Sequence, residues 1–285
     1  MPTETNRVTF GVHWENAAET TSNLLMAALP EVDRERLLSA CRSVELPLSE
    51  LLCERDELTA EVYFPTRAFV SLISLADARA GVELGMIGRE GMLGSHLCLN
   101  VFKSPLRGVV QGQGHAWRIP TDEFIDHMQR SPALRGLMQR YQYFLTGQQA
   151  TSAACLRFHQ VDQRLARWLL MSDDRAPGSF LQMTQEFVAY MLGVRRVGTS
   201  VATSSLVREG LIDYRHGQIR LLDRDRLQHV ACSCYEADRR SYDALFGGSH
   251  EQDRRASEDR EPAIVPPQGS DVPERAHHDG IVGRD

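Results

Sequence analysis

The stretch TQEFVAYMLGVRRVGTSVATSSL, residues 184–206, contains two short helical patterns separated by Gly193. Thr184 can cap the first helix, because its hydroxyl can accept a hydrogen bond from a backbone N–H of the first turn. Gly193 tolerates the left-handed backbone that ends one helix and lets the next leave at a steep angle. In the second helix, the spacing places Ala202 and Leu206 on the inward face. These features predict a helix-turn-helix.

The outward face of the second helix is short and rich in hydroxyl groups. Its residues at helical spacing are Arg196, Val197, Ser200 and Ser204. An arginine near the amino end of such a helix can enter the major groove and bond a guanine edge, whereas Arg195 is predicted to contact a phosphate. The alternative is that the paired arginines only mark a solvated turn.

The segment GLIDYRHGQIRLLD, residues 210–223, predicts a wing after the helix pair. Two strands would meet at the turn His216-Gly217, because glycine is favoured in tight hairpin turns. Arg215 would then lie near the flanking DNA backbone. The whole pattern therefore predicts a winged helix-turn-helix that binds double-stranded DNA.

Composition agrees with a globular protein. Of 285 residues, 42% are hydrophobic and 25% are charged, and no run approaches the roughly 20 apolar residues of a membrane span. We therefore expect a cytoplasmic protein with no membrane partner. The net charge of −6 arises mostly in residues 247–285, where nine acidic residues face five arginines. This tail is predicted to be disordered, because it has little apolar surface to bury.

Residues 125–158 are predicted to form a long dimerisation helix. Its apolar stripe recurs at alternating spacings of four and three, as in helices that pack along a partner. The predicted seam consists of Leu137, Tyr141, Phe144, Gln148, Thr151 and Cys155, and Phe158 ends the stripe. The seam favours a homodimer. The alternative is a helix that lies along its own domain.

The chain before this helix changes to short apolar runs separated by turn residues, which predicts an antiparallel β-roll. The fold class is therefore α+β. The predicted divisions are a flexible segment (1–22), the β-roll sensor domain (23–124), the dimerisation helix (125–158), the winged helix-turn-helix (159–246) and the tail (247–285).

This order of parts resembles the Crp/Fnr superfamily of bacterial transcription regulators. The residues that carry the resemblance are RFHQVDQRLARWLLM (157–171), TQEFVAYMLGVRR (184–196) and LVREGLIDYRHGQI (206–219). It implies a cyclic-nucleotide-binding-like β-roll that senses an effector and a dimer that reads a palindromic promoter. It also implies that Thr184 touches a phosphate and Arg196 reads guanine. An activator of this type would contact RNA polymerase.

Cyclic-nucleotide-binding members present Gly-Glu-Leu and, after a gap, Arg followed by Ser or Thr. The corresponding stretch here is LGSHLCLNVFKSPLRGVV, residues 93–110. Gly94 matches, but Ser95 stands at the glutamate position and Arg107 is followed by Gly108. Gly94, Ser95 and Arg107 remain a weak candidate effector pocket, and cyclic AMP is not the expected ligand. The effector, if one exists, is an unknown small molecule.

No metal or cofactor is predicted. The six cysteines are scattered, and an iron–sulfur sensor of this superfamily would need several near the amino terminus. Cys232 and Cys234 form the one close pair and are interpreted as small residues on a helix, and His159 is placed at a hinge. With no phosphate loop or nucleophile elbow, no enzyme activity is expected. The alternative is a ligand-binding β-roll or a cupin-like enzyme with an appended winged helix.

Overall fold

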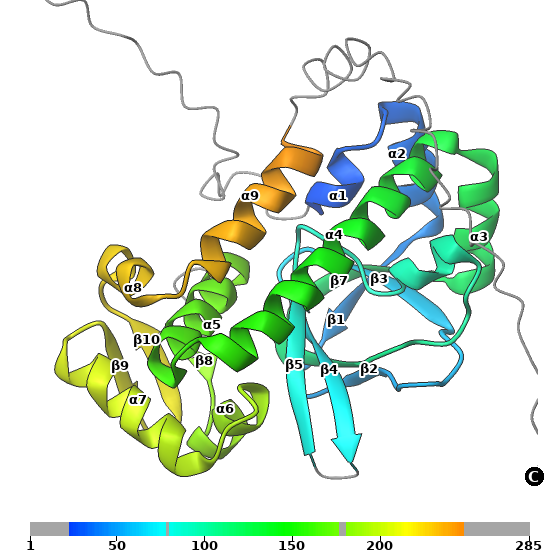
Figure 1. Cartoon of the computed structure of the whole chain (residues 1–285). Helices are drawn as coiled ribbons and strands as arrows, with labels where there is room; N and C mark the ends of the chain where they lie inside the picture. Colours follow the sequence, from blue (N-terminus) through cyan, green and yellow to red (C-terminus); the bar gives the residue numbers. More distant parts are fainter. Residues whose placement is uncertain (1–22, 78–79, 177–180, 248–285) are drawn as a thin grey trace, which may run out of the picture. The chain divides into compact units, whose positions relative to one another are not determined.

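The computed structural model describes residues 23–77, 80–176 and 181–247 (Figure 1). The predicted flexible segment and nearly all of the predicted tail lie outside these residues. Within them, no helix is both long and apolar enough to cross a bilayer. The chain opens with two short helices, α1 (Leu24–Ala27) and α2 (Glu31–Ala40), and Pro30 caps the second. The side chain of Asn23 caps α1 by accepting a hydrogen bond from the Met26 N–H at 3.0 Å.

Two antiparallel sheets then form the predicted β-roll. One sheet has the order β1-β7-β3 and the other the order β2-β6-β4-β5, and a 3-10 helix, η1, lies between β5 and β6 in sequence. The bounds are β1 Arg42–Leu46, β2 Leu51–Cys53, β3 Glu61–Pro65, β4 Phe69–Asp77, β5 Ala80–Ile87, η1 Ser95–Leu99, β6 Arg107–Gly112 and β7 Gly114–Pro120. These interleaved pairings confirm a roll rather than βαβ units.

Strand β4 is buried on both faces, and this positions the carboxy-terminal domain. Val70 and Leu72 face the core of the roll. Phe69 and Ile73 instead join the core of the following helical domain. Since apolar groups cover both faces of β4, this strand belongs to the core of the roll and to the core of the helical domain.

The predicted dimerisation helix is in fact two helices. Helix α3 (Thr121–Arg130) ends at Ser131, and α4 (Pro132–Phe158) begins immediately after it. The Ser131 side chain accepts a hydrogen bond from the Leu134 N–H at 3.0 Å, and Pro132 suits the first helical turn because its missing N–H needs no partner there. The long helix therefore starts at Pro132 rather than near residue 125.

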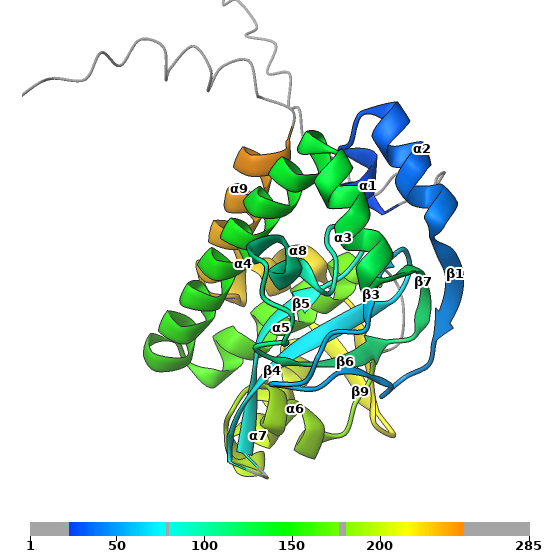
Figure 2. The ribbon, with the colours of Figure 1, turned by 90° about the vertical axis from the view of Figure 1, so that its right-hand side faces the viewer.

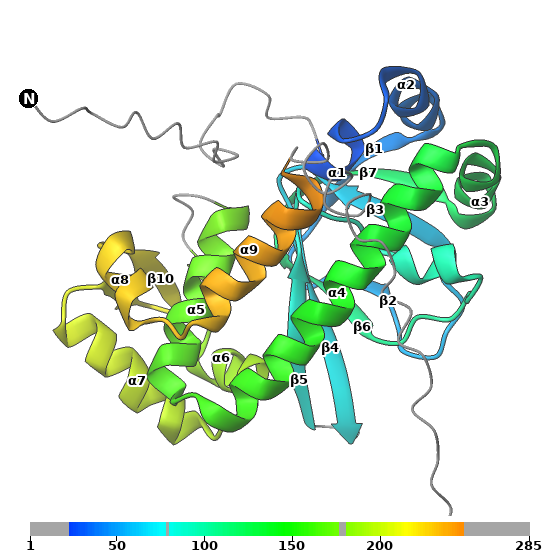
Figure 3. The ribbon, with the colours of Figure 1, turned by 45° about the horizontal axis from the view of Figure 1, so that its top comes forward.

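The structure buries most of the predicted dimer seam within the single chain. Leu137, Tyr141, Phe144, Gln148 and Cys155 are all at most 4% exposed within the single chain, and Thr151 is half-buried. Helix α9 (Cys234–Phe246) runs along α4 and covers this face (Figures 1 and 3). The Phe144 ring centroid lies 5.3 Å from that of Tyr242 and 6.5 Å from that of Phe246. The apolar stripe therefore fits the alternative interpretation, a helix packed on its own chain.

The carboxy-terminal domain has the predicted winged form. Its elements are α5 Val161–Arg175, β8 Leu181–Gln182, α6 Gln185–Met191, α7 Arg196–Arg208, β9 Ile212–Arg215, β10 Gln218–Leu221 and α8 Arg224–Val230, followed by α9. The wing is a three-stranded sheet of order β8-β10-β9. His216 and Gly217 have φ values of 51° and 76°, as a two-residue type I′ hairpin turn requires. This confirms the predicted strand, turn and strand.

Helix α5 is more buried than its sequence suggests. Arg164 and Arg167 are only 7% and 8% exposed, although arginine is a charged residue that usually faces water. Arg164 donates to the Leu192 carbonyl, and Arg167 forms an ion pair of 2.7 Å with Asp238 of α9. Buried guanidinium groups persist where such partners compensate their lost hydration.

Polar contacts also join α5 to the roll, where α5 lies behind β4 and β5 (Figure 2). The Trp168 indole donates to Glu83 of β5 at 3.0 Å. At the end of α5, Arg175 pairs with Glu90 at 2.6 Å, and both side chains are under a tenth exposed. Because burial disfavours the charged carboxylate, the pKa of Glu83 is raised to about 7, against the hydrogen bond from Ser71.

Candidate nucleic-acid interface

The turn between α6 and α7 has the geometry that the sequence predicts. The Thr184 hydroxyl accepts a hydrogen bond from the Phe187 N–H at 3.1 Å and so caps α6. At the other end, Gly193 has φ of 60°. The Val194 N–H bonds to the Ala189 carbonyl at 2.9 Å, and the Gly193 N–H bonds to the Tyr190 carbonyl at 3.1 Å. These two bonds form a Schellman motif, which ends α6 and redirects the chain into α7.

Helix α7 divides into a buried and an exposed face. Thr199, Ala202 and Leu206 point inward and are at most 4% exposed. On the other side, Val197 and Val201 are 75% and 67% exposed. Large aliphatic side chains exposed on a helix can form part of a binding surface. In a DNA groove they can contact the methyl group of thymine.

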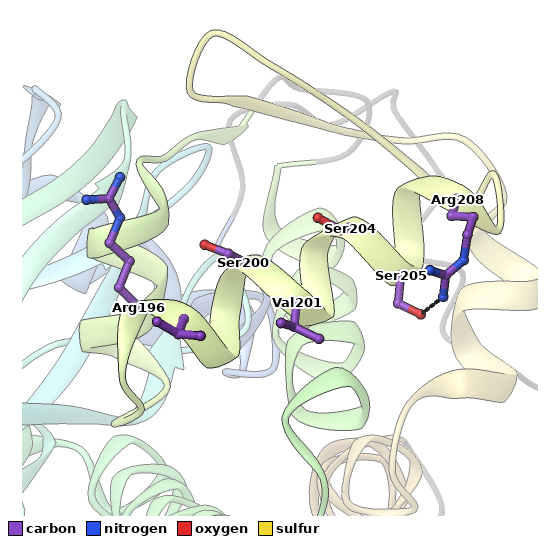
Figure 4. Close-up of a pocket in the computed structure, with 7 residues that line it drawn as sticks. Arg196, Ser200, Val201, Ser204, Ser205 and Arg208 are labelled. Carbon is purple, nitrogen blue, oxygen red and sulfur yellow. Dashed lines mark hydrogen bonds between the residues drawn. The ribbon is translucent and has the colours of Figure 1, made fainter.

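The exposed face forms a shallow hollow along α7. It is lined by Arg196, Val197, Ser200, Val201, Ser204, Ser205 and Arg208. Ser200 and Ser204 lie along one edge, and Val201 and Ser205 along the other (Figure 4). The prediction named four of these residues as DNA contacts and did not include Val201, Ser205 and Arg208. Their signal was the continued step of four residues, from Arg196 through Ser204 to Arg208 and from Val197 through Val201 to Ser205.

Within the described residues, the side chains of Arg195 and Arg196 form no ion pair or hydrogen bond, and both are exposed. Three other polar residues of the face have protein partners. Ser200 donates to the Gln185 side chain of α6, and Arg208 donates to Ser205 at 3.1 Å (Figure 4). The two adjacent arginines are therefore available to bind a ligand.

Arg215 lies at the wing, at the end of β9. Its Nε donates to Asp213 at 3.0 Å, and the arginine side chain is 78% exposed. An exposed pair of this kind is worth little in water, so a phosphate can replace the carboxylate at small cost. Thr184, Arg195, Arg196 and Arg215 thus come from α6, α7 and the wing of one domain.

The candidate effector residues are engaged by other groups of the roll. Gly94 has φ of 104° and begins η1. The Ser95 hydroxyl donates to Gln142 of α4 at 2.7 Å. Arg107 donates three hydrogen bonds of 2.5 to 3.1 Å to the carboxylate of Glu54, two from its Nε and one from its Nη2. The ion pair with Arg107 holds the pKa of Glu54 below its usual value.

Comparisons with known proteins agree with this geometry. The family model of the Crp-like helix-turn-helix domain matches residues 163–230. No curated protein sequence matches the chain. Among solved structures, FixK2 from Bradyrhizobium japonicum superposes with a TM-score of 0.58 at 16% identity, over 68% of this chain and 98% of that one.

Two further structures share the fold. A transcriptional regulator of the Crp/Fnr family from Eubacterium rectale has a TM-score of 0.58 at 15% identity, over 72% of this chain and 96% of its own. The c-di-GMP-responsive global regulator CLP from Xanthomonas campestris has a TM-score of 0.54 at 18% identity, over 67% and 99%. The chain therefore contains a Crp-like helix-turn-helix domain, and its fold, in which a β-roll precedes that domain, is similar to that of the Crp/Fnr-family structure.

Proposed function

We propose that this chain acts as a homodimer that binds a palindromic promoter site and regulates transcription rather than catalysing a reaction. The observation that carries the proposal is the exposed face of α7, where Arg196 has no protein partner and Val197 and Val201 stand in water. A helix with an arginine near its amino end and small side chains on its exposed face can enter the major groove.

The residues have separate roles in this proposal. Arg196 makes a two-bond contact with a guanine edge, and the two valines contact thymine methyl groups. Arg195, Thr184 and Arg215 bind phosphates, which fixes the register of the domain without reading sequence. Ser200 and Ser204 lie on the same face and add hydroxyl contacts to bases or phosphates.

The proposed dimer uses the face of α4 that the chain leaves open. Tyr143 and Phe158 are 71% and 74% exposed on it. Gly147, Ala150 and Ala154 lie between them on the same side and are also exposed. Small residues at helical spacing let two α4 helices approach closely, and the aromatic rings at each end can then be buried. This face replaces the predicted seam of Tyr141 and Phe144.

A two-fold dimer presents two α7 helices, so half-sites are expected about one helical turn apart, roughly 10 to 10.5 base pairs. Cyclic AMP is not the proposed effector, because Ser95 replaces the acceptor for a ribose hydroxyl and Arg107 is already held by Glu54. The proposed effector is a different small molecule that binds the roll. RNA polymerase is the further partner if the regulator is an activator, in the cytoplasm where the promoter is found.

The test is selection of bound sequences from a random DNA pool with the wild type, Arg196→Ala and Arg195→Ala. Arg196→Ala should cost about 1 to 3 kcal/mol and relax the preference at one base of each half-site. Arg195→Ala is the matched control and should weaken specific and random DNA alike, with a flatter salt dependence. Equal losses on specific and random DNA for both variants would contradict the assigned roles.

A further inference from the structure

Four side chains of the kinds that bind metals meet at the carboxy-terminal end of α4. Cys155 and His159 are one helical turn apart at that end. Cys232, which contacts Cys155, lies 77 positions after it in the sequence, and Cys234, which contacts His159, lies 75 positions after it. Their candidate ligand atoms all lie within 4.8 Å of one another. Cys232 precedes α9 and Cys234 is its first residue, so the pair does not lie on one helix as the sequence suggested.

Two of the distances between these atoms are close to the edge length of a coordination tetrahedron. The Cys155 Sγ lies 3.5 Å from the Cys232 Sγ, and the Cys234 Sγ lies 3.6 Å from the His159 Nδ1. Four ligands around one zinc ion, with Zn–S bonds of about 2.3 Å, give edges of about 3.8 Å between sulfurs. Only small side-chain shifts would therefore be needed to bring all four atoms around one ion.

Buried cations lie beside the cluster and can balance the charge of thiolates, the form that binds metals. The three cysteines are free and at most 7% exposed. Arg167 is close enough to Cys155 to interact with its charge. Arg164 is also close enough to the cluster to interact with Cys155 and Cys232. Three thiolates, a neutral histidine and Zn²⁺ carry a net charge of −1, which these buried guanidinium groups can balance.

We propose that Cys155, His159, Cys232 and Cys234 form a mononuclear Cys3His site for Zn²⁺. One tetrahedral ion uses all four side chains, as in closed structural zinc sites. An iron–sulfur cluster distributes its ligands over several irons, which needs wider spacing than this group has. A disulfide would use only two of the four residues, and it would not explain why the other two side chains lie in the same cluster.

The position of the site implies a structural role. It links the last turn of α4, immediately before α5 and the winged domain, to the loop between α8 and α9. Because α9 returns along α4, a bound ion would fasten the start of α9 to the carboxy-terminal end of α4. Metal binding contributes directly to folding stability when the ligands come from separate segments of the chain. Removal of the metal should therefore lower the melting temperature of the full chain and loosen the winged domain from α4.

Two metal measurements on the full-length chain, free of any affinity tag, test the proposal. Protein purified without chelators is expected to contain one zinc per chain by mass spectrometry of the metal. The reduced apo protein should bind one equivalent of Co²⁺, with thiolate-to-cobalt charge transfer in the near ultraviolet and intense tetrahedral bands in the visible. Neither readout depends on DNA binding, so the site and the proposed function can fail separately.

Cys232→Ser and Cys234→Ser should each weaken Co²⁺ binding at least 100-fold. Cys98→Ser is the matched control, because Cys98 lies in η1 outside the cluster, and it should bind like the wild type. The Co²⁺ titration of the wild type decides the question even if a cluster variant fails to fold. The proposal is overturned if the reduced wild type gives no charge-transfer band at micromolar concentrations, or if Cys98→Ser loses binding equally. It is also overturned if the isolated chain holds a Cys155–Cys232 disulfide and reduction restores no metal binding.

Discussion

Phe144 and its neighbour Tyr143 lie on different faces of α4, one buried and one exposed, and substituting each by alanine should separate folding from dimerisation. Phe144 is 4% exposed and Tyr143 is 71% exposed. Phe144 packs against Tyr242 and Phe246 of α9. The first substitution therefore opens the contact between α4 and α9, whereas the second removes a ring that the described residues leave exposed and that the proposed dimer would bury.

The magnitude follows from the buried area. An aromatic side chain buries about 150 to 250 Å², which at about 25 cal/mol per Å² stabilises the fold by about 4 to 6 kcal/mol. Alanine keeps the β-carbon, and the cavity is partly filled by relaxation of the neighbouring rings. We therefore expect Phe144→Ala to lower the free energy of unfolding by about 3 to 5 kcal/mol. Tyr143→Ala should change the stability of the isolated subunit by less than about 0.5 kcal/mol.

The assay is urea unfolding at several protein concentrations, together with sedimentation of the folded protein. The effect of Phe144→Ala should be the same at every concentration. The effect of Tyr143→Ala should grow with concentration, because dimerisation stabilises the folded chain by mass action, and sedimentation should show more monomer. The assignment of the two faces is wrong if Phe144→Ala yields folded monomers of unchanged subunit stability, or if Tyr143→Ala destabilises the chain equally at all concentrations.

Two further substitutions test the contact between the roll and the winged domain. Glu83, which accepts from Trp168, has its pKa raised from 4.5 to about 7, so its contribution to stability is complete below pH 4.5 and is lost as the pH rises through 7. Glu83→Gln should flatten the fall in unfolding free energy over this range, and an unchanged pH profile would exclude Glu83 as its source. Gly193→Ala places a side chain at φ of 60°, with its β-carbon 3.1 Å from Val82, and should cost about 1 to 2 kcal/mol in chemical unfolding. Gly198→Ala is the control within α7, where a β-carbon meets nothing within 4 Å. It should raise the free energy of unfolding by about 0.5 to 1 kcal/mol. Equal losses of stability for Gly193→Ala and Gly198→Ala would refute the argument from backbone strain.

The sequence by itself determined the local structure of the winged domain. The cap at Thr184, the left-handed Gly193 and the His216-Gly217 turn each depend on the backbone preferences of one or two residues. The exposed and buried faces of α7 follow from the helical period, because a single domain covers one side of it. For these reasons the helix-turn-helix and the wing were predictable from the sequence, and the β-roll was predictable from its short apolar runs separated by turn residues.

Only the tertiary structure decided which partner covers each face of α4. An apolar stripe shows that a helix packs against something, but the same stripe suits a second subunit or a distant helix of the same chain. Here α9 returns from the far end of the winged domain to cover it. That return also brings Cys232 and Cys234 to Cys155 and His159. Neither pair alone completes a metal site, because the four ligands become neighbours only when the chain crosses back over α4.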